Sequence, residues 1–128
     1  MIKRTIQTEQ APAAIGPYSQ AIRTGDFLYT SGQIALDPES GIFLSGEIEE
    51  ETEQTLKNIS AILQAGGLSL ENVVKTTVYL SDLNHFSRMN QVYEKYFSKT
   101  KPARACVQVA ALPKGAKIEI DAIANCSS

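Results

Sequence analysis

The chain has 128 residues, of which 43% are hydrophobic and 20% are charged, and its formal net charge is −2. This composition is typical of one folded domain, so we expect a single domain over residues 1–128 and exclude a largely disordered chain. No apolar run is long enough to span a bilayer, and the slight excess of acids does not favour binding to nucleic acid or to an anionic membrane.

The chain has few cysteines and histidines. Its two cysteines, Cys106 and Cys126, follow an N-terminus without an export signal, which indicates a reducing, cytoplasmic compartment rather than a disulfide framework. Two thiols and one histidine are too few for a structural zinc site, so we expect no metal. Any relay that needs a histidine would depend on His85, which we expect at the surface.

Hydrophobic patterning locates two helices and five of the strands. Gly25-Asp26 is a two-residue loop that favours a hairpin. Before Gly66-Gly67, apolar residues recur at every third or fourth position, which predicts a helix with an acidic start. The expected elements are strands over 19–24 and 27–33, a helix over 47–65, a strand over 73–81, a helix over 86–97, and strands over 103–109 and 117–124. We expect the order β-β-β-α-β-α-β-β, with about six strands, and therefore an α+β fold with both helices on one face.

The alternation of side chains along the strands predicts two different sheet faces. Ile118, Ile120, Ala122 and Ala124 share an apolar face that the helices should cover. We expect the other face to mix apolar and polar residues, namely Phe27, Tyr29, Cys106, Ile123, Arg104, Glu119, Ser31 and Gln33. Such a face is neither a core nor an ordinary solvent face, which favours burial against other copies of the chain. Arg104 and Glu119 could form a structural ion pair there or belong to a site.

Several segments, in order along nearly the whole chain, carry a resemblance to a known family. They include residues 14–21 (AIGPYSQA), 30–34 (TSGQI), 54–63 (QTLKNISAIL), 73–80 (VVKTTVYL), 89–97 (MNQVYEKYF), 102–107 (PARACV) and 112–120 (LPKGAKIEI). The chain resembles the RidA-type branch of the Rid (YjgF) family. The resemblance implies a chorismate-mutase-like, two-layer fold and a homotrimer with clefts between subunits. It also implies hydrolysis of 2-imino acids and enamines such as 2-aminoacrylate to 2-keto acids and ammonia, without a cofactor.

The resemblance also implies the residues of the site. Arg104 would anchor the substrate carboxylate, for which a guanidinium offers two parallel hydrogen bonds, and Glu119 would orient or deprotonate the attacking water. Tyr18 would close over the cleft. The other expected substrate-binding residues are Ser31, Gly32, Asn90 and Cys106, with Cys106 acting through its backbone N–H. For Asn90, helix capping or packing is an alternative role.

Two other functions compete with deamination. One is the endoribonuclease, or translation inhibitor, activity attributed to some family members. A single histidine and fourteen acids against twelve bases do not favour cleavage of RNA. The other is a non-catalytic protein that binds 2-keto acids or a regulatory partner through the same cleft, which would need Arg104 but not Glu119.

Overall fold

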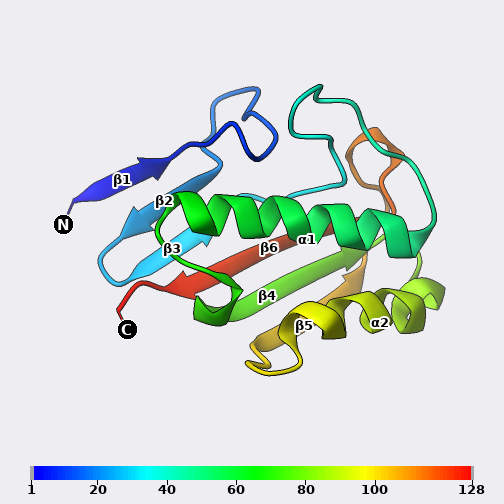
Figure 1. The fold of residues 1–128 in the computed structure, drawn as a ribbon. Coiled ribbons are helices and arrows are strands. Elements are labelled where there is room, and N and C mark those ends of the chain that lie inside the picture. Colours follow the sequence, from blue (N-terminus) through cyan, green and yellow to red (C-terminus); the bar gives the residue numbers. More distant parts are fainter. Residues whose placement is uncertain (1, 128) are drawn as a thin grey trace.

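One mixed sheet carries both helices on the same face in the computed structural model, which describes residues 2–127 (Figure 1). The strands are β1 (Lys3–Ile6), β2 (Ala21–Thr24), β3 (Phe27–Thr30), β4 (Val73–Leu80), β5 (Ala103–Gln108) and β6 (Ile118–Asn125). The helices are α1 (Ile48–Ala65) and α2 (Phe86–Phe97), with short 3-10 turns at Leu70–Asn72, Leu83–His85 and Pro113–Gly115. The expected α+β class and element order are confirmed, and β1 is the strand that the sequence pattern did not locate.

The strand order is β1-β2-β3-β6-β4-β5, so β1 and β5 form the two edges of the sheet. The pair β4 and β5 is parallel, because α2 connects them, and the other neighbours are antiparallel. The predicted hairpin is confirmed: Thr24 pairs with Phe27 across a two-residue turn, and Gly25 takes a φ of 58° that favours glycine.

Helix α1 begins and ends where its sequence provides caps. The backbone N–H of Glu47 donates to Glu50 Oε1 at 3.2 Å, and Glu50 is one of three glutamates in the first turn, where the helix dipole favours anions. At the other end Gly67 has a φ of 78°, and the N–H of Leu68 donates to the carbonyl of Leu63 at 2.9 Å. The helix packs its apolar side, including Leu56 and Ile59, against the sheet.

The central strands confirm the predicted alternation. On β6 the side chains of Ile118, Ile120, Ala122 and Ala124 are at most 2% exposed beneath the helices. On β3 the Leu28 side chain is fully buried, whereas Phe27 and Tyr29 remain 39% and 44% exposed on the open face of the sheet. The open face is therefore partly apolar, as expected.

The prediction for β5 was wrong. Arg104 pairs with Thr76 and Cys106 pairs with Val78, and both of these β4 partners are fully buried on the helix side. Since paired residues share a face, Arg104 and Cys106 lie on the helix side, and Val107 lies on the open face. The register of an edge strand is set by its neighbour, and two aromatic rings of α2 contact the Arg104 cation, so the more apolar side of β5 need not face the helices.

Gln33 was also placed on the wrong face. It forms an isolated bridge with Ile120 and is 6% exposed, which puts it on the helix side. Strand β3 ends at Thr30, and the chain leaves the extended pattern at Ser31 and Gly32, so the period of two no longer applies there.

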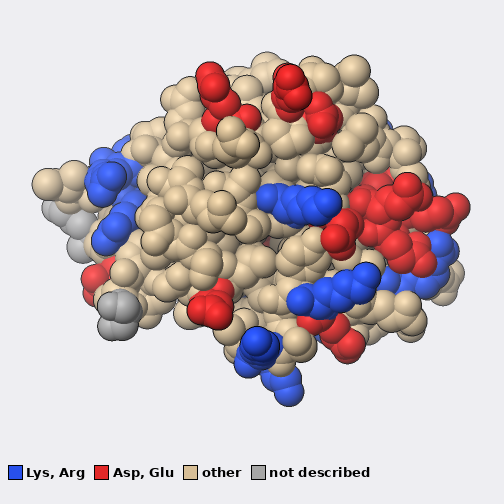
Figure 2. Space-filling view, viewed as in Figure 1, with Lys and Arg blue, Asp and Glu red and all other residues tan. Residues whose placement is uncertain are grey.

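Charged side chains are mixed over the helix-bearing face, and acids gather over the start of α1 (Figure 2). Arg88 of α2 bridges Glu47 and Glu49 there, with N–O distances of 2.8 and 2.7 Å. The fully buried Glu51 accepts from the backbone N–H of Lys117 at 2.9 Å and from its Nζ at 3.3 Å, which fixes the start of β6. None of the described helices is long and apolar enough to cross a membrane.

Candidate active site

Arg104 lies in a cradle formed by three side chains of α2, namely Phe86, Asn90 and Tyr93. Its guanidinium carbon lies 5.2 Å from the ring centre of Phe86 and 4.7 Å from that of Tyr93. Its Nη1 donates to Asn90 Oδ1 at 2.6 Å. Cation–π contacts and one hydrogen bond orient the guanidinium and leave its other donors available.

Tyr93, one of the three side chains of this cradle, also contacts residues of the core. The hydroxyl of Tyr93 lies 2.7 Å from Thr76 Oγ1, and the Tyr93 ring packs on Phe97 with centres 4.7 Å apart. Burial raises the pKa of Tyr93, so its phenol stays protonated at neutral pH. The Tyr93 ring therefore gives Arg104 a rigid, uncharged support at the edge of a hollow of about 610 Å³ between α2 and β5.

Asn90 acts in this cradle rather than as a helix cap. It lies inside α2, four residues after Phe86, and its Nδ2 donates to Glu94 Oε1 at 3.0 Å. The alternative role in capping is thus excluded by position. The spacing i, i+4, i+7 puts Phe86, Asn90 and Tyr93 on one face of the helix. This spacing is visible in the sequence, and starting from Asn90 it would have identified the two rings that contact Arg104.

Cys106 lies on the same side of β5 and is half-buried against the core. Burial raises the pKa of the Cys106 thiol, although the positive charge of Arg104 acts in the opposite direction. A thiol with a raised pKa is mostly protonated at neutral pH and is a weak nucleophile. Strand β5 is an edge strand, so backbone N–H groups along its outer side are open to a ligand.

Glu119 lies on the opposite face of the sheet from Arg104. It pairs with Tyr79 on β4, whose side chain is on the open face. Its carboxylate packs directly on Gly32, where an added Cβ would lie 2.9 Å from Glu119 Cδ and closer still to Oε2. Residue 32 must therefore be glycine for Glu119 to keep this position. Burial, and secondarily the negative charge of Asp121, raise the pKa of Glu119.

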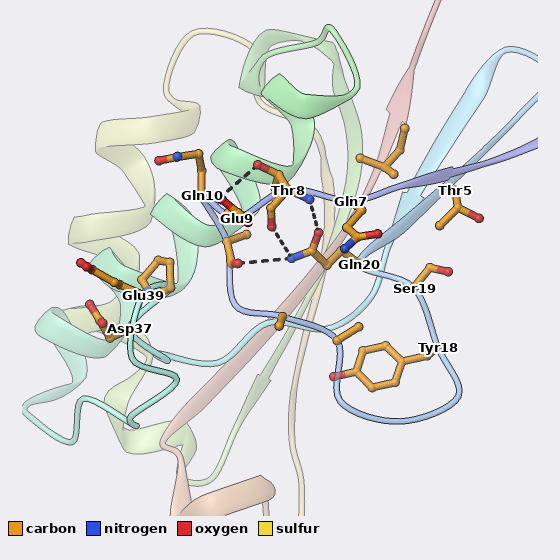
Figure 3. A pocket seen from close by; sticks show the side chains of 15 residues that line it. Thr5, Gln7, Thr8, Glu9, Gln10, Tyr18, Ser19, Gln20, Asp37 and Glu39 are labelled. Atoms are coloured by element: carbon orange, nitrogen blue, oxygen red, sulfur yellow. Dashed lines mark hydrogen bonds between the residues drawn. The ribbon is translucent and has the colours of Figure 1, made fainter.

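Ser31 directly precedes Gly32, and Tyr18 lies on the adjoining loop segment, next to Ser19 to which Ser31 is bonded. Ser31 Oγ donates to the carbonyl of Ser19 at 2.5 Å, which fixes the serine beside Gly32. Tyr18 is 53% exposed, and its N–H donates to the carbonyl of Gly16 at 2.9 Å. Its ring lies at a groove of about 910 Å³, which is lined by residues 5–11, 13, 14, 18–20 and 37–39 (Figure 3).

The expected site residues thus form two half-sites in one chain. The first half-site comprises Arg104, Asn90 and Cys106 on the helix side of β5. The second comprises Ser31, Gly32 and Glu119 around the start of β6, together with Tyr18 on the loop segment that Ser31 contacts through Ser19. The sheet separates them, so a direct Arg104–Glu119 ion pair, one of the alternatives from the sequence, is not formed.

His85 is less exposed than expected. Its Nδ1 is buried and has no hydrogen-bond partner within residues 2–127. His85 is the last residue of the 3-10 turn and directly precedes α2. Within the same range, no group of three or more His, Cys, Asp or Glu side chains is placed to hold a metal ion.

Comparisons with known proteins find similar sequences and similar folds over nearly the whole chain. Residues 8–126 match the model of the endoribonuclease L-PSP family. The chain is 54% identical over 124 residues to the 2-iminobutanoate/2-iminopropanoate deaminase of Homo sapiens, covering 97% of this chain and 90% of the human one. Among solved structures it is similar to E. coli TdcF with bound serine (42% identity, TM-score 0.91, covering 97% and 99% of the two chains). It is also similar to RidA from Psychrobacter sp. (48% identity, TM-score 0.91, covering 95% and 98%).

Proposed function

Because this chain belongs to the endoribonuclease L-PSP family, which includes the Rid (YjgF) proteins, we propose that it is a 2-iminobutanoate/2-iminopropanoate deaminase. The reaction adds water to the C=N bond of a 2-imino acid and releases a 2-keto acid and ammonia. The observation that carries this proposal is Arg104, held by its cradle with free donors toward a hollow. A small amino acid bound to the relative TdcF supports a ligand that bears a carboxylate.

In the proposed mechanism, Arg104 binds the substrate carboxylate through two parallel hydrogen bonds, which also fix the direction of the imine carbon. In the protonated form of the imine, Glu119 accepts a proton from water as the water oxygen bonds to that carbon, and the electron pair of the C=N bond moves to the nitrogen, which gives a neutral carbinolamine. Glu119 then donates this proton to the amino group, the C–N bond breaks to release ammonia, and Glu119 takes the hydroxyl proton as the C=O bond of the ketone forms. The ammonia finally takes up this proton and leaves as ammonium, so Glu119 is again ionised. The imine is already reactive, so positioning and one proton carrier are sufficient.

The proposed site requires two copies of the chain, because Arg104 and Glu119 lie on opposite faces of the sheet. We propose a homotrimer in which the first half-site of one subunit meets the second half-site of its neighbour. The unpaired edge of β5 and the exposed Phe27, Tyr29 and Val107 on the open face support burial against other copies. A cyclic assembly uses every copy of both half-sites, whereas a dimer formed through one such contact does not.

The first experiment measures turnover directly. A pyridoxal-phosphate enzyme acting on serine generates 2-aminoacrylate in place, and the purified protein should release pyruvate much faster than the spontaneous reaction does. Pyruvate release at the spontaneous rate would contradict the proposal. Binding of a 2-keto acid without turnover would then indicate the non-catalytic alternative, and cleavage of a labelled RNA would indicate the endoribonuclease.

We also place the protein in the cytoplasm. The free thiols of Cys106 and Cys126 support a reducing compartment. A short-lived imine must also be intercepted where it forms, beside the pyridoxal-phosphate enzymes that release it.

The substitution Cys106→Ala should keep at least about half of the wild-type kcat/KM, because the proposed contact uses the backbone and the raised pKa of the thiol makes it a weak nucleophile. Steady-state kinetics with 2-aminoacrylate measure this. Loss of all activity in a folded variant, together with a substrate adduct on Cys106 of the wild-type protein in a mass spectrum, would instead show a thiol nucleophile.

The pH profile should report the raised pKa of Glu119. As a base, Glu119 works only when ionised, so kcat/KM should fall as the pH drops through its pKa, at a higher pH than for an ordinary glutamate. The substitution Asp121→Asn removes the neighbouring charge and should move this acid limb to lower pH. Tyr79, which donates to Asp121 Oδ2 at 3.2 Å, has a pKa raised by burial and stays neutral across that range. If the residual activity of Glu119→Gln keeps the same acid limb, the limb belongs to another group.

A further inference from the structure

The loop between β1 and β2, residues 7–20, carries Tyr18 and has neither helix nor strand along its length. Long irregular loops are ordered only when their ends and their backbone groups are held, and such loops often carry function. Both ends of this loop meet at one side chain, that of Gln20 (Figure 3). Gln20 has no role in the proposed mechanism.

The Gln20 side chain is 3% exposed and is bonded on both sides. Its Oε1 accepts from the N–H of Thr8 at 2.7 Å, and its Nε2 donates to the carbonyls of Thr8 at 3.0 Å and Pro12 at 2.7 Å. The carbonyl of Ala11 lies 3.3 Å from the same nitrogen. Since an amide nitrogen has two hydrogens for these three carbonyls, one hydrogen is shared, and no apolar side chain could replace this donor.

The backbone around Gln20 holds the second half-site at the same point. The carbonyl of Gln20 accepts from the N–H of Ser31 at 2.9 Å, and the carbonyl of Ser19 accepts from Ser31 Oγ. Tyr18 precedes these two residues directly. The side chain of Gln20 thus closes the loop 7–20, while its main chain joins that loop to Ser31 beside Gly32.

We propose that Gln20 is a positioning residue that holds Tyr18 and Ser31 in place for catalysis by closing the loop 7–20. This inference rests on the proposed function, because it takes Tyr18 and Ser31 as parts of the cleft. Without the amide, the carbonyls of residues 8, 11 and 12, of which the last two are buried, would lose their donor and turn toward water. The loop would then open, and Tyr18 would spend less time in its catalytic orientation.

The test combines a spectroscopic measurement with a double-mutant cycle. Gln20→Glu keeps the size of the side chain but replaces the donor with an oxygen facing three carbonyls. The protein is labelled with 3-fluorotyrosine, and Tyr18→Phe identifies the Tyr18 fluorine signal. In Gln20→Glu that signal should narrow and move toward the value of free fluorotyrosine, while the other tyrosine signals stay in place. The core variant Ile62→Ala, on α1, should lower the melting temperature without moving the Tyr18 signal.

Kinetics then separate positioning from general destabilisation. We expect Gln20→Glu to lower kcat/KM about tenfold in the wild-type background but less than about threefold in the Tyr18→Phe background, because the effect passes mainly through Tyr18. Equal losses in the two backgrounds, or an unmoved Tyr18 signal, would overturn the inference. If Tyr18→Phe alone is fully active, the role of Tyr18 in the proposed function fails; if it is impaired while Gln20→Glu is fully active, only the inference about Gln20 fails.

A measurement on the unmodified protein covers the case in which Gln20→Glu does not fold. The amide hydrogens of Thr8 and Ser31, which donate to the side chain and the main chain of Gln20, should exchange with solvent far more slowly than in an unfolded peptide. Exchange at the unfolded rate at Thr8 would show that the amide does not close the loop, and would overturn the inference.

Discussion

Arg104→Ala should abolish deamination while the protein remains folded. The substitution removes two charge-assisted hydrogen bonds to the substrate carboxylate, each worth about 1.5–3 kcal/mol. Because about 1.4 kcal/mol corresponds to a tenfold change in rate, kcat/KM should fall at least about a hundredfold. Arg104→Lys should recover little activity, since an ammonium cannot form a planar fork or stack on Phe86 and Tyr93 as a guanidinium does.

Arg88→Ala is the matched control for the loss of one positive charge. Arg88 is also a residue of α2, where it lies between Phe86 and Asn90 of the cradle. Its side chain is 44% exposed and contacts Glu47 and Glu49 rather than β5. Exposed ion pairs contribute little to stability, so this variant should stay folded and keep its activity within about twofold. Initial rates of pyruvate release at several imine concentrations compare the variants. Near-normal turnover by Arg104→Ala would remove Arg104 from the mechanism.

The central part of the fold follows from local patterns in the sequence. The Gly25-Asp26 loop predicts the hairpin, because few residue pairs allow so tight a turn. The apolar period and the glycine pair at its end predict α1 almost to the residue. In β6 the alternation is strict, and this strand lies in the middle of the sheet, where one face must be buried.

The edges of the sheet could not be predicted in the same way. Strand β1 is short and starts with Lys3 and Arg4, so it shows neither an apolar run nor alternation. In β5 the residues alternate, but the sequence does not say which side faces the helices. The aromatic rings of α2 contact the Arg104 cation on the helix side of β5. The small apolar residues of β5 therefore lie on the open face of the sheet. Side-chain polarity alone therefore assigns the wrong face.

The residues of the proposed site were named by resemblance, and the structure explains their separation along the chain. Gly32 allows Glu119 to pack against the backbone, and Asn90 links α2 to Arg104. The sequence could not show that these contacts form two half-sites on opposite faces of the sheet. That arrangement depends on the register between β4, β5 and β6, which is a long-range property.

Phe27→Glu should lower trimer content and deaminase activity together. Phe27 is 39% exposed on the open face, and a charge there would have to lose its hydration when another copy packs against it. Ile2→Glu is the control: Ile2 is 82% exposed and precedes β1, at the edge of the sheet farthest from β5, so assembly should be unchanged. Light scattering coupled to size exclusion gives the mass, and the deaminase assay is run on the same fractions. A fully active monomer would contradict the need for assembly, and a stable dimer would contradict its three-fold symmetry.

Mixing two inactive variants tests whether each site is shared between subunits. Arg104→Ala keeps a complete second half-site, and Glu119→Gln keeps a complete first half-site. When the two are unfolded together in equal amounts and refolded, a site is intact only if a Glu119→Gln subunit supplies Arg104 and an Arg104→Ala neighbour supplies Glu119. Random assembly makes this true for about a quarter of the sites, so about a quarter of the wild-type activity should return. If Arg104 and Glu119 of one subunit served the same site, every site would lack one of them, and the mixture would stay as inactive as its components.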